Sequence, residues 1–337
     1  MDRRCGAVLL ALALGVATAA EYPQTQLDNG QIKVTVDPPD VAKGFYKGSR
    51  FDWSGVIENV EYRGHSYYGR WYQKMEPDVH DFIYRGAELV TSPVTAIAGP
   101  VEEFMELGYD NAKPGGTFVK IGVGALRKPD GGKYDHFHLY EIADPGKWSV
   151  RQGMDFIEFT QQLNDAGSGY AYVYRKVVRL VPGKPEFTLE HSLKNTGHRA
   201  IDDQVYNHNF LFLDRQAPGP GVVITVPFQI HTPNPPDKKF AEVRGNQIVY
   251  NKTLEGEERV AMAVQGFGAT AKDYDFRVEY RKAGAGVRVT GDRPLASEAL
   301  WSIRAPLAVE PYITVSAAPG AEFTWKMTYE YYTLPKQ

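Results

Sequence analysis

Histidine and carboxylate side chains are the residues of this sequence whose surroundings favour acid–base chemistry. In the segment YNHNFLFLD, residues 206–214, Asn207, His208 and Asn209 directly precede an apolar run. Amide hydrogen bonds from flanking asparagines can hold an imidazole in one tautomer, as a proton donor or acceptor requires. The same pattern also fits a histidine that makes only structural hydrogen bonds, so the residues alone leave both roles open.

A second candidate is Glu310, which lies in the apolar stretch PLAVEPYITV directly before Pro311. A carboxylate in such surroundings either pairs with a cation or has its pKa raised by desolvation, which suits base chemistry. The sequence has no phosphate-binding glycine loop, no Gly-x-Ser-x-Gly elbow and no His-Glu-x-x-His motif. We therefore expect proton transfer without a cofactor, rather than nucleotide-dependent or serine-hydrolase chemistry.

Two further histidines, His136 and His138 in YDHFHLYEI, are separated by one residue. On a strand, such a spacing turns both side chains to the same face. A pair of this kind can bind a metal, but the sequence offers no clear third ligand. We therefore predict no metal site, and expect His138 to contact substrate in a cleft.

The elements that must position these residues have the period-two pattern of half-buried antiparallel strands, separated by dense Pro/Gly turns. The clearest strands are at 170–181, 187–194, 276–282 and 323–332, whereas the best helical candidates, 295–304 and 100–107, are short. Regular strand spacing indicates a sandwich or barrel. The Pro/Gly-rich segment 216–236 is interpreted as an irregular surface excursion around a short apolar strand.

The N-terminus, MDRRCGAVLLALALGVATAA, has two arginines, a short apolar run and small residues near its end. This is the pattern of a secretory signal peptide over 1–20, followed by one domain over 21–337 that is periplasmic or secreted. No later stretch is long enough to span a membrane. The only cysteine, Cys5, lies in the signal, and a net charge of -3 without strong clusters gives no indication of nucleic-acid binding.

The two candidate segments, in this order and at this separation, resemble the galactose-mutarotase (aldose 1-epimerase) superfamily. The similarity is strongest over 170–214, where a strand and a turn lead to Asn-His and an aromatic-rich strand, and from Val309 onward, with a glutamate, a Pro-Gly turn and a terminal aromatic strand. The resemblance implies an all-β fold, a large antiparallel β-sandwich (supersandwich). It also implies that sugar anomers are interconverted, with His208 protonating the ring oxygen and Glu310 taking the proton of the anomeric hydroxyl.

The sequence departs from the familiar enzymes of that family, which carry a second histidine in a Leu-His-Gly-Gly segment. The corresponding region, 98–109, offers Glu102 and Glu103 instead, and this difference bears on which sugar is used. The family has an arginine near its N-terminal substrate strands, and Arg50 in GFYKGSRFDWSG corresponds to it. Arg50 either bonds the sugar or pairs with Asp52 or another surface acid, and the sequence favours neither.

The expected partner is a monosaccharide or oligosaccharide, and the expected state is a monomer or homodimer. The residues that we expect to contact the sugar are Arg50, Glu103, His138 and Asn207. Two other functions remain open on the same fold. One is a carbohydrate-binding relative without turnover, and the other is a polysaccharide lyase or hydrolase.

Overall fold

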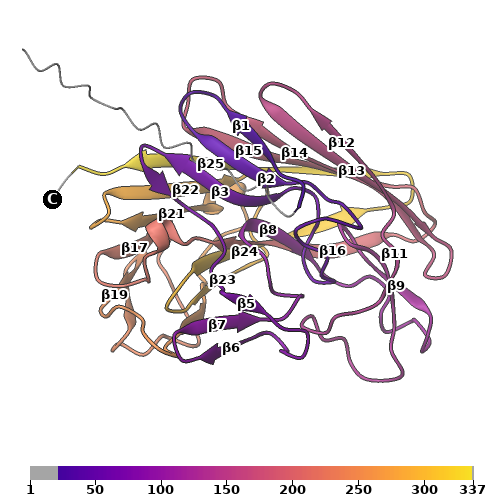
Figure 1. Cartoon of the computed structure of the whole chain (residues 1–337), viewed down its shortest axis with the longest axis horizontal. Coiled ribbons are helices and arrows are strands. Elements are labelled where there is room, and N and C mark those ends of the chain that lie inside the picture. Colours follow the sequence, from indigo (N-terminus) through magenta and orange to yellow (C-terminus); the bar gives the residue numbers. More distant parts are fainter. Residues whose placement is uncertain (1–21, 336–337) are drawn as a thin grey trace, which may run out of the picture.

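A computed structural model describes residues 22–335, and its largest element is a ten-stranded antiparallel sheet that lies along the upper part of Figure 1. The predicted signal peptide, 1–20, lies outside the described residues. Alternating burial along the long strands shows that one face of this sheet is packed and the other is more open. In sheet order the strands are β12 (Lys147–Gln152), β13 (Phe156–Asp165), β14 (Tyr170–Leu180), β15 (Glu186–Asn195), β25 (Glu322–Thr333), β22 (Ala285–Gly291), β21 (Asp275–Tyr280), β17 (Val222–Thr225), β19 (Gln247–Tyr250) and β18 (Ala241–Arg244).

A second, five-stranded antiparallel sheet crosses the middle of Figure 1 and packs against the first. Its order is β20 (Val260–Ala263), β23 (Ser297–Ser302), β24 (Leu307–Ala317), β16 (Ile201–Phe210) and β8 (Gly99–Phe104). Aromatic contacts join the two sheets: the ring of Phe104 meets Tyr174 at 5.3 Å and Trp325 at 6.0 Å between centroids. The main apolar core therefore lies between the sheets.

Smaller sheets and two short 3₁₀ helices complete the described part of the chain. One sheet is formed by β1 (Thr25–Asp28), β2 (Lys33–Asp37), β3 (Val56–Tyr62) and β4 (His65–Ser66). The others are β11 (Ile142–Asp144), β10 (Gly124–Arg127) and β9 (Thr117–Lys120), and β5 (Lys74–Met75), β7 (Glu88–Thr91) and β6 (Phe82–Arg85). The helices are η1 (Leu213–Arg215) and η2 (Ala271–Asp273). Within residues 22–335, no helix has the length and apolar character needed to cross a membrane.

The four strands predicted from periodicity correspond to β14, β15, β21 and β25, so these predictions are confirmed. The two helical candidates are wrong, because 100–107 contains β8 and 295–304 contains β23. Both candidates are short, and over so few residues periodicity cannot separate a strand from a helical turn. Segment 216–236 contains the short apolar strand that was expected there, β17, between irregular flanks, and β17 lies inside the ten-stranded sheet.

Candidate active site

The pairing of β16 with β24 brings His208 and Glu310 together. The antiparallel register places Tyr206 opposite Tyr312. Two residues later on β16 and two residues earlier on β24, the same register places His208 opposite Glu310, with both side chains on the same face. His208 Nε2 lies 3.2 Å from Glu310 Oε1. Two residues that are 102 positions apart in the sequence thus form one titrating pair.

This pair lines a cavity of about 310 Å³ beside the five-stranded sheet. Aromatic rings form part of its wall, and polar side chains from other elements converge on it. The aromatic members include Phe82, Phe137, Phe210 and Trp301, and the polar members include Arg50, Asp81, His136 and Asn234. Apolar faces with a few convergent polar groups are typical of a small-molecule site.

Burial shifts the proton affinities of the two central residues in opposite directions. Burial, together with the charge of Arg50, holds the pKa of His208 well below its ordinary value. Burial raises the pKa of Glu310 to about 7, with Arg50 opposing the shift and Glu103 adding to it. Below about pH 7 the pair therefore holds one proton, and the directions of the two shifts place it on Glu310 rather than on His208, across the 3.2 Å contact.

Aromatic side chains fix the orientation of the His208 ring. It stacks on Phe210 with 3.7 Å between centroids and meets the edge of Trp301 at 5.6 Å. Its Nδ1 atom is buried and has no hydrogen-bond partner among the described residues. Packing rather than a hydrogen-bonded neighbour thus orients this imidazole, and Nε2 is the ring nitrogen that contacts Glu310.

The expected Glu103 and Arg50 form a buried ion pair at the cavity wall. Arg50 Nε donates to Glu103 Oε2 over 2.7 Å, and Tyr206 Oη donates to the same oxygen over 2.6 Å. The buried Lys120 ammonium donates to Glu103 Oε1 over 3.1 Å. Burial opposes ionisation of Glu103, but Lys120 and Arg50 outweigh it and hold the pKa of this carboxyl well below its usual range. Glu103 thus anchors Arg50, which itself reaches the cavity.

Glu102, the other acidic residue of this segment, faces the opposite side of β8. One oxygen of its carboxylate contacts the Lys176 ammonium, and the other lies 2.9 Å from His191 Nε2, at hydrogen-bond distance. Burial disfavours its charge, but Lys176 and His191 lower its pKa to about 2. Asp52 belongs to this same buried cluster, where Tyr174 Oη donates to it over 2.9 Å. Of the two partners considered for Arg50, Asp52 therefore lies in another cluster, and Arg50 pairs with Glu103.

Two expected sugar contacts do not fit their positions in the structure. Asn207 points away from the cavity, and its Nδ2 donates to the Tyr329 hydroxyl over 2.8 Å. That hydroxyl in turn donates to Asn209 Oδ1 over 2.8 Å. Because strand side chains alternate, the asparagines that flank His208 must face the core and join the two sheets. His138 is exposed and does not line the cavity.

The segment around His136 and His138 is a loop, so the strand geometry that would turn both side chains to one face does not apply. The Asp135 carboxylate accepts the backbone N–H of Phe137 over 3.0 Å, and the Tyr140 hydroxyl accepts that of Asp135 over 2.9 Å. These local hydrogen bonds compete with strand pairing. Only His136 of the histidine pair reaches the cavity. No group of three or more His, Cys, Asp or Glu side chains suited to a metal occurs in the described part, 22–335.

The sequence reasoning missed several cavity residues, of which Asp81 is the most informative. Asp81 precedes β6, and its Oδ1 accepts a hydrogen bond from Thr95 Oγ1 over 2.8 Å. Burial raises its pKa. Asp81, Asn234 and Trp301 carry no motif and come from three separate segments, so only the fold reveals that they line one cavity with His208.

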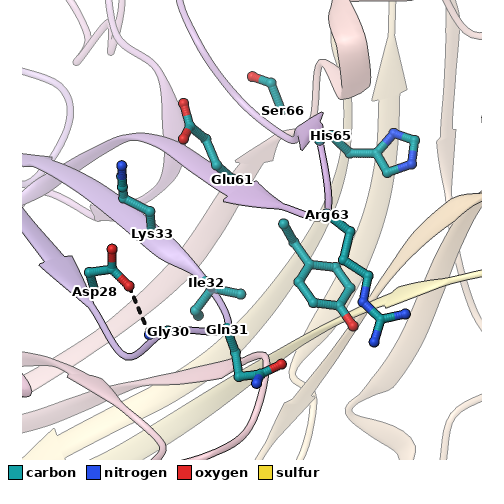
Figure 2. A pocket seen from close by; sticks show the side chains of 11 residues that line it. Asp28, Gly30, Gln31, Ile32, Lys33, Glu61, Arg63, His65 and Ser66 are labelled. Carbon is teal, nitrogen blue, oxygen red and sulfur yellow. Dashed lines mark hydrogen bonds between the residues drawn. The ribbon is translucent and has the colours of Figure 1, made fainter.

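A larger hollow, about 510 Å³, lies between the turn that joins β1 to β2 and the turn that joins β3 to β4 (Figure 2). Its walls are turn residues such as Gln31, Lys33 and Glu61, and the one hydrogen bond drawn there joins the Gly30 N–H to Asp28 Oδ1 at 2.8 Å. Most of the residues that line this hollow are exposed or half-buried. Chemistry therefore favours the smaller cavity at His208.

No protein-family model matches the sequence, and neither does any curated protein. Solved structures do match: the Slr1438 protein from Synechocystis sp. PCC 6803 is 12% identical, with a TM-score of 0.55 over 96% of this chain and 100% of its own. A galactose mutarotase-like protein from Lactobacillus casei ATCC 334 is 11% identical, with a TM-score of 0.52 over 92% and 100%. A GalM/aldose epimerase homologue from C. elegans is 12% identical, with a TM-score of 0.52 over 93% and 99%. The chain therefore has the β-sandwich fold of the galactose mutarotase-like superfamily, as its sequence predicted.

Proposed function

We propose that this protein is an exported aldose 1-epimerase-like enzyme that interconverts the anomers of a free sugar. The observation that carries the proposal is the contact between His208 Nε2 and Glu310 Oε1, 3.2 Å apart in a cavity with aromatic walls. Two proton-transfer groups that lie side by side can act on the two oxygens of one hemiacetal carbon.

In the proposed reaction, the His208 imidazolium donates its proton to the ring oxygen while the Glu310 carboxylate takes the proton of the anomeric hydroxyl. The bond between the anomeric carbon and the ring oxygen breaks, and the anomeric carbon becomes an aldehyde. Rotation of this carbonyl presents its other face. Glu310 then returns its proton to the carbonyl oxygen, and His208 recovers its own as the ring closes, so atoms and protons balance.

The pKa shifts of the pair support these roles. Because burial lowers the pKa of His208, its imidazolium is a strong acid when it forms. Because burial raises the pKa of Glu310 to about 7, its carboxylate is a stronger base than an ordinary glutamate. Both shifts favour proton transfer to and from the sugar. Below about pH 7 the pair holds one proton, which rests on Glu310; its transfer to His208 Nε2 across the 3.2 Å contact gives the imidazolium and carboxylate that the reaction requires.

The walls of the cavity suit a sugar ring. Trp301, Phe137 and Phe82 offer apolar faces to C–H groups, and Arg50 and Asp81 offer a donor and an acceptor to hydroxyls. Arg50 uses Nε and Nη2 on Glu103 and Tyr206, which holds the guanidinium rigid at the wall. A preorganised donor of this kind reduces the entropic cost of binding.

The test is anomer-resolved proton NMR or polarimetry on freshly dissolved α-glucose, α-galactose and other aldoses. Wild-type protein should accelerate equilibration of at least one sugar, and His208→Gln and Glu310→Gln should each lose about 10²-fold or more. Glu61→Gln, in the distant hollow of Figure 2, is the matched control. Folded protein that accelerates no aldose would refute the proposal, and sugar binding without acceleration would indicate a carbohydrate-binding relative.

Export is a separate part of the proposal and rests on the signal-like segment 1–20. Expression of the full chain in a bacterial host, followed by fractionation and N-terminal sequencing, tests it. A mature N-terminus at Ala20 or Glu21 in the exported fraction supports export. A full-length chain retained in the cytoplasm contradicts it.

A further inference from the structure

A second hollow adjoins the catalytic cavity and shares part of its wall. It has a volume of about 360 Å³ and is lined by Glu103, Met105, Glu106, Tyr134, Asp135, His136 and Phe137. His136 and Phe137 also line the cavity that holds His208 and Glu310. We call the first the inner cavity and the second the outer hollow. One short stretch of loop, His136–Phe137, is thus the boundary between them.

The outer hollow presents a hydrogen-bond acceptor that the protein itself does not use. Glu106 is half-buried, and within residues 22–335 its carboxylate has no hydrogen bond or ion pair with another residue. Burial raises its pKa, which shows that water solvates this carboxyl incompletely. A ligand hydroxyl that donates to Glu106 would supply the missing partner.

Apolar surface accompanies this acceptor. Met105 and Phe137 line the outer hollow together with the ring of Tyr134. A carboxylate acceptor beside an aromatic face is a chemical match for a pyranose ring, which presents hydroxyls at its rim and C–H groups on its faces. The outer hollow therefore repeats the combination of polar and aromatic groups found in the inner cavity.

The boundary loop is held in place by contacts from three directions. Lys120 Nζ donates to the Tyr134 hydroxyl over 2.9 Å, and His80 Nε2 lies 2.7 Å from Asp135 Oδ2. On the inner side, the Arg50 guanidinium carbon lies 4.8 Å from the centre of the Phe137 ring. Phe137 is therefore a positioned side chain, with the inner cavity on one side and the outer hollow on the other.

The inner cavity alone, about 310 Å³, is at the lower end of the range of roughly 300–1,000 Å³ for small-molecule pockets. The outer hollow about doubles that space. Two adjoining hollows with matching chemistry fit two linked rings better than one.

We propose that the substrate is the reducing end of a disaccharide or longer oligosaccharide, and this inference rests on the proposed function. The reducing ring occupies the inner cavity, with its anomeric carbon at His208 and Glu310. The next ring lies across Phe137 in the outer hollow and donates a hydroxyl hydrogen bond to Glu106.

The experiment compares each aldose that the wild-type protein accelerates with disaccharides that carry this aldose at their reducing end, in 1,4 and 1,6 linkage. At least one disaccharide should have a kcat/KM about tenfold or more above that of its monosaccharide. Glu106→Gln should reduce this ratio about tenfold, as expected when a neutral amide oxygen replaces a charged acceptor. Glu61→Gln is the matched control, since Glu61 is exposed and lies in the distant hollow.

The outcomes separate the two proposals. Acceleration of monosaccharides with equal or lower kcat/KM for every disaccharide overturns the oligosaccharide inference and leaves the epimerase proposal intact. A disaccharide preference that Glu106→Gln does not change overturns the assignment of the outer hollow. Failure to accelerate any sugar, while the protein is folded, refutes the proposed function itself.

Discussion

If the proposed reaction occurs, the proton count of the His208–Glu310 pair determines its pH dependence. The reactive state has one proton, and the pair loses this proton above the pKa of Glu310, about 7. Each further pH unit reduces the one-proton fraction about tenfold. We therefore expect kcat/KM, which reports the free enzyme, to be about 100-fold lower at pH 9 than at pH 6.

The acid side of the profile should behave differently. The pair binds a second proton only when His208 becomes charged while Glu310 stays protonated, and burial holds the pKa of His208 well below its ordinary value. Activity should therefore persist well below pH 6.5 before it falls. The profile is bell-shaped, with its basic limb near neutrality.

Polarimetry between pH 5 and 9 measures this profile, once the uncatalysed rate at each pH is subtracted, because hydroxide also accelerates anomer exchange. Circular dichroism at pH 9 checks that the protein remains folded. A rate that stays constant or rises from pH 7 to 9 in folded protein would refute the one-proton mechanism. A basic limb that persists unchanged in Glu310→Gln would show that another group controls it.

Three further predictions concern stability and are measured by urea unfolding. Glu103→Gln leaves two buried cations without their counter-ion and should lower the free energy of unfolding by about 3–5 kcal/mol. Glu298 is buried with an unpartnered oxygen, and burial raises its pKa to about 8. Between about pH 4.5 and 8 the folded protein therefore keeps a proton on this carboxyl that the unfolded chain releases. Glu298→Gln should therefore become increasingly stabilising as pH rises toward 8, reaching about 2 kcal/mol after the cost of burying the amide; a difference independent of pH would contradict this. Gly99→Ala should lower the free energy of unfolding by at least about 2 kcal/mol, because φ is +68° and the added Cβ would lie 1.7 Å from the Ile57 carbonyl oxygen. An unchanged urea midpoint would argue against that packing.

The strand pattern and the two central residues could be predicted from the sequence because their signals are local. Period-two alternation is strong in long strands such as β14 and β25, where one face is buried along ten residues or more. His208 and Glu310 stand out because each is a titratable residue within an apolar run, and the structure brings them together.

The rest of the cavity could not be predicted, because it depends on long-range packing. Asp81 and Asn234 have ordinary local sequences and reach the cavity only through the folded arrangement. Asn207 looked like a site residue because it adjoins His208, but strand alternation turns it toward the core. His138 was expected in the cleft, whereas the loop formed by local hydrogen bonds brings His136 to the cavity instead.

The back-to-back placement of Glu102 and Glu103 on β8 constrains how this protein can evolve. Insertion or deletion of one residue before them would exchange their faces and bring each carboxylate to the wrong set of cations, so the length of the strand is not free to vary. Substitutions, however, can be accepted on one face at a time. The cavity side can therefore diversify toward new ligands while the ion cluster on the core side is inherited unchanged.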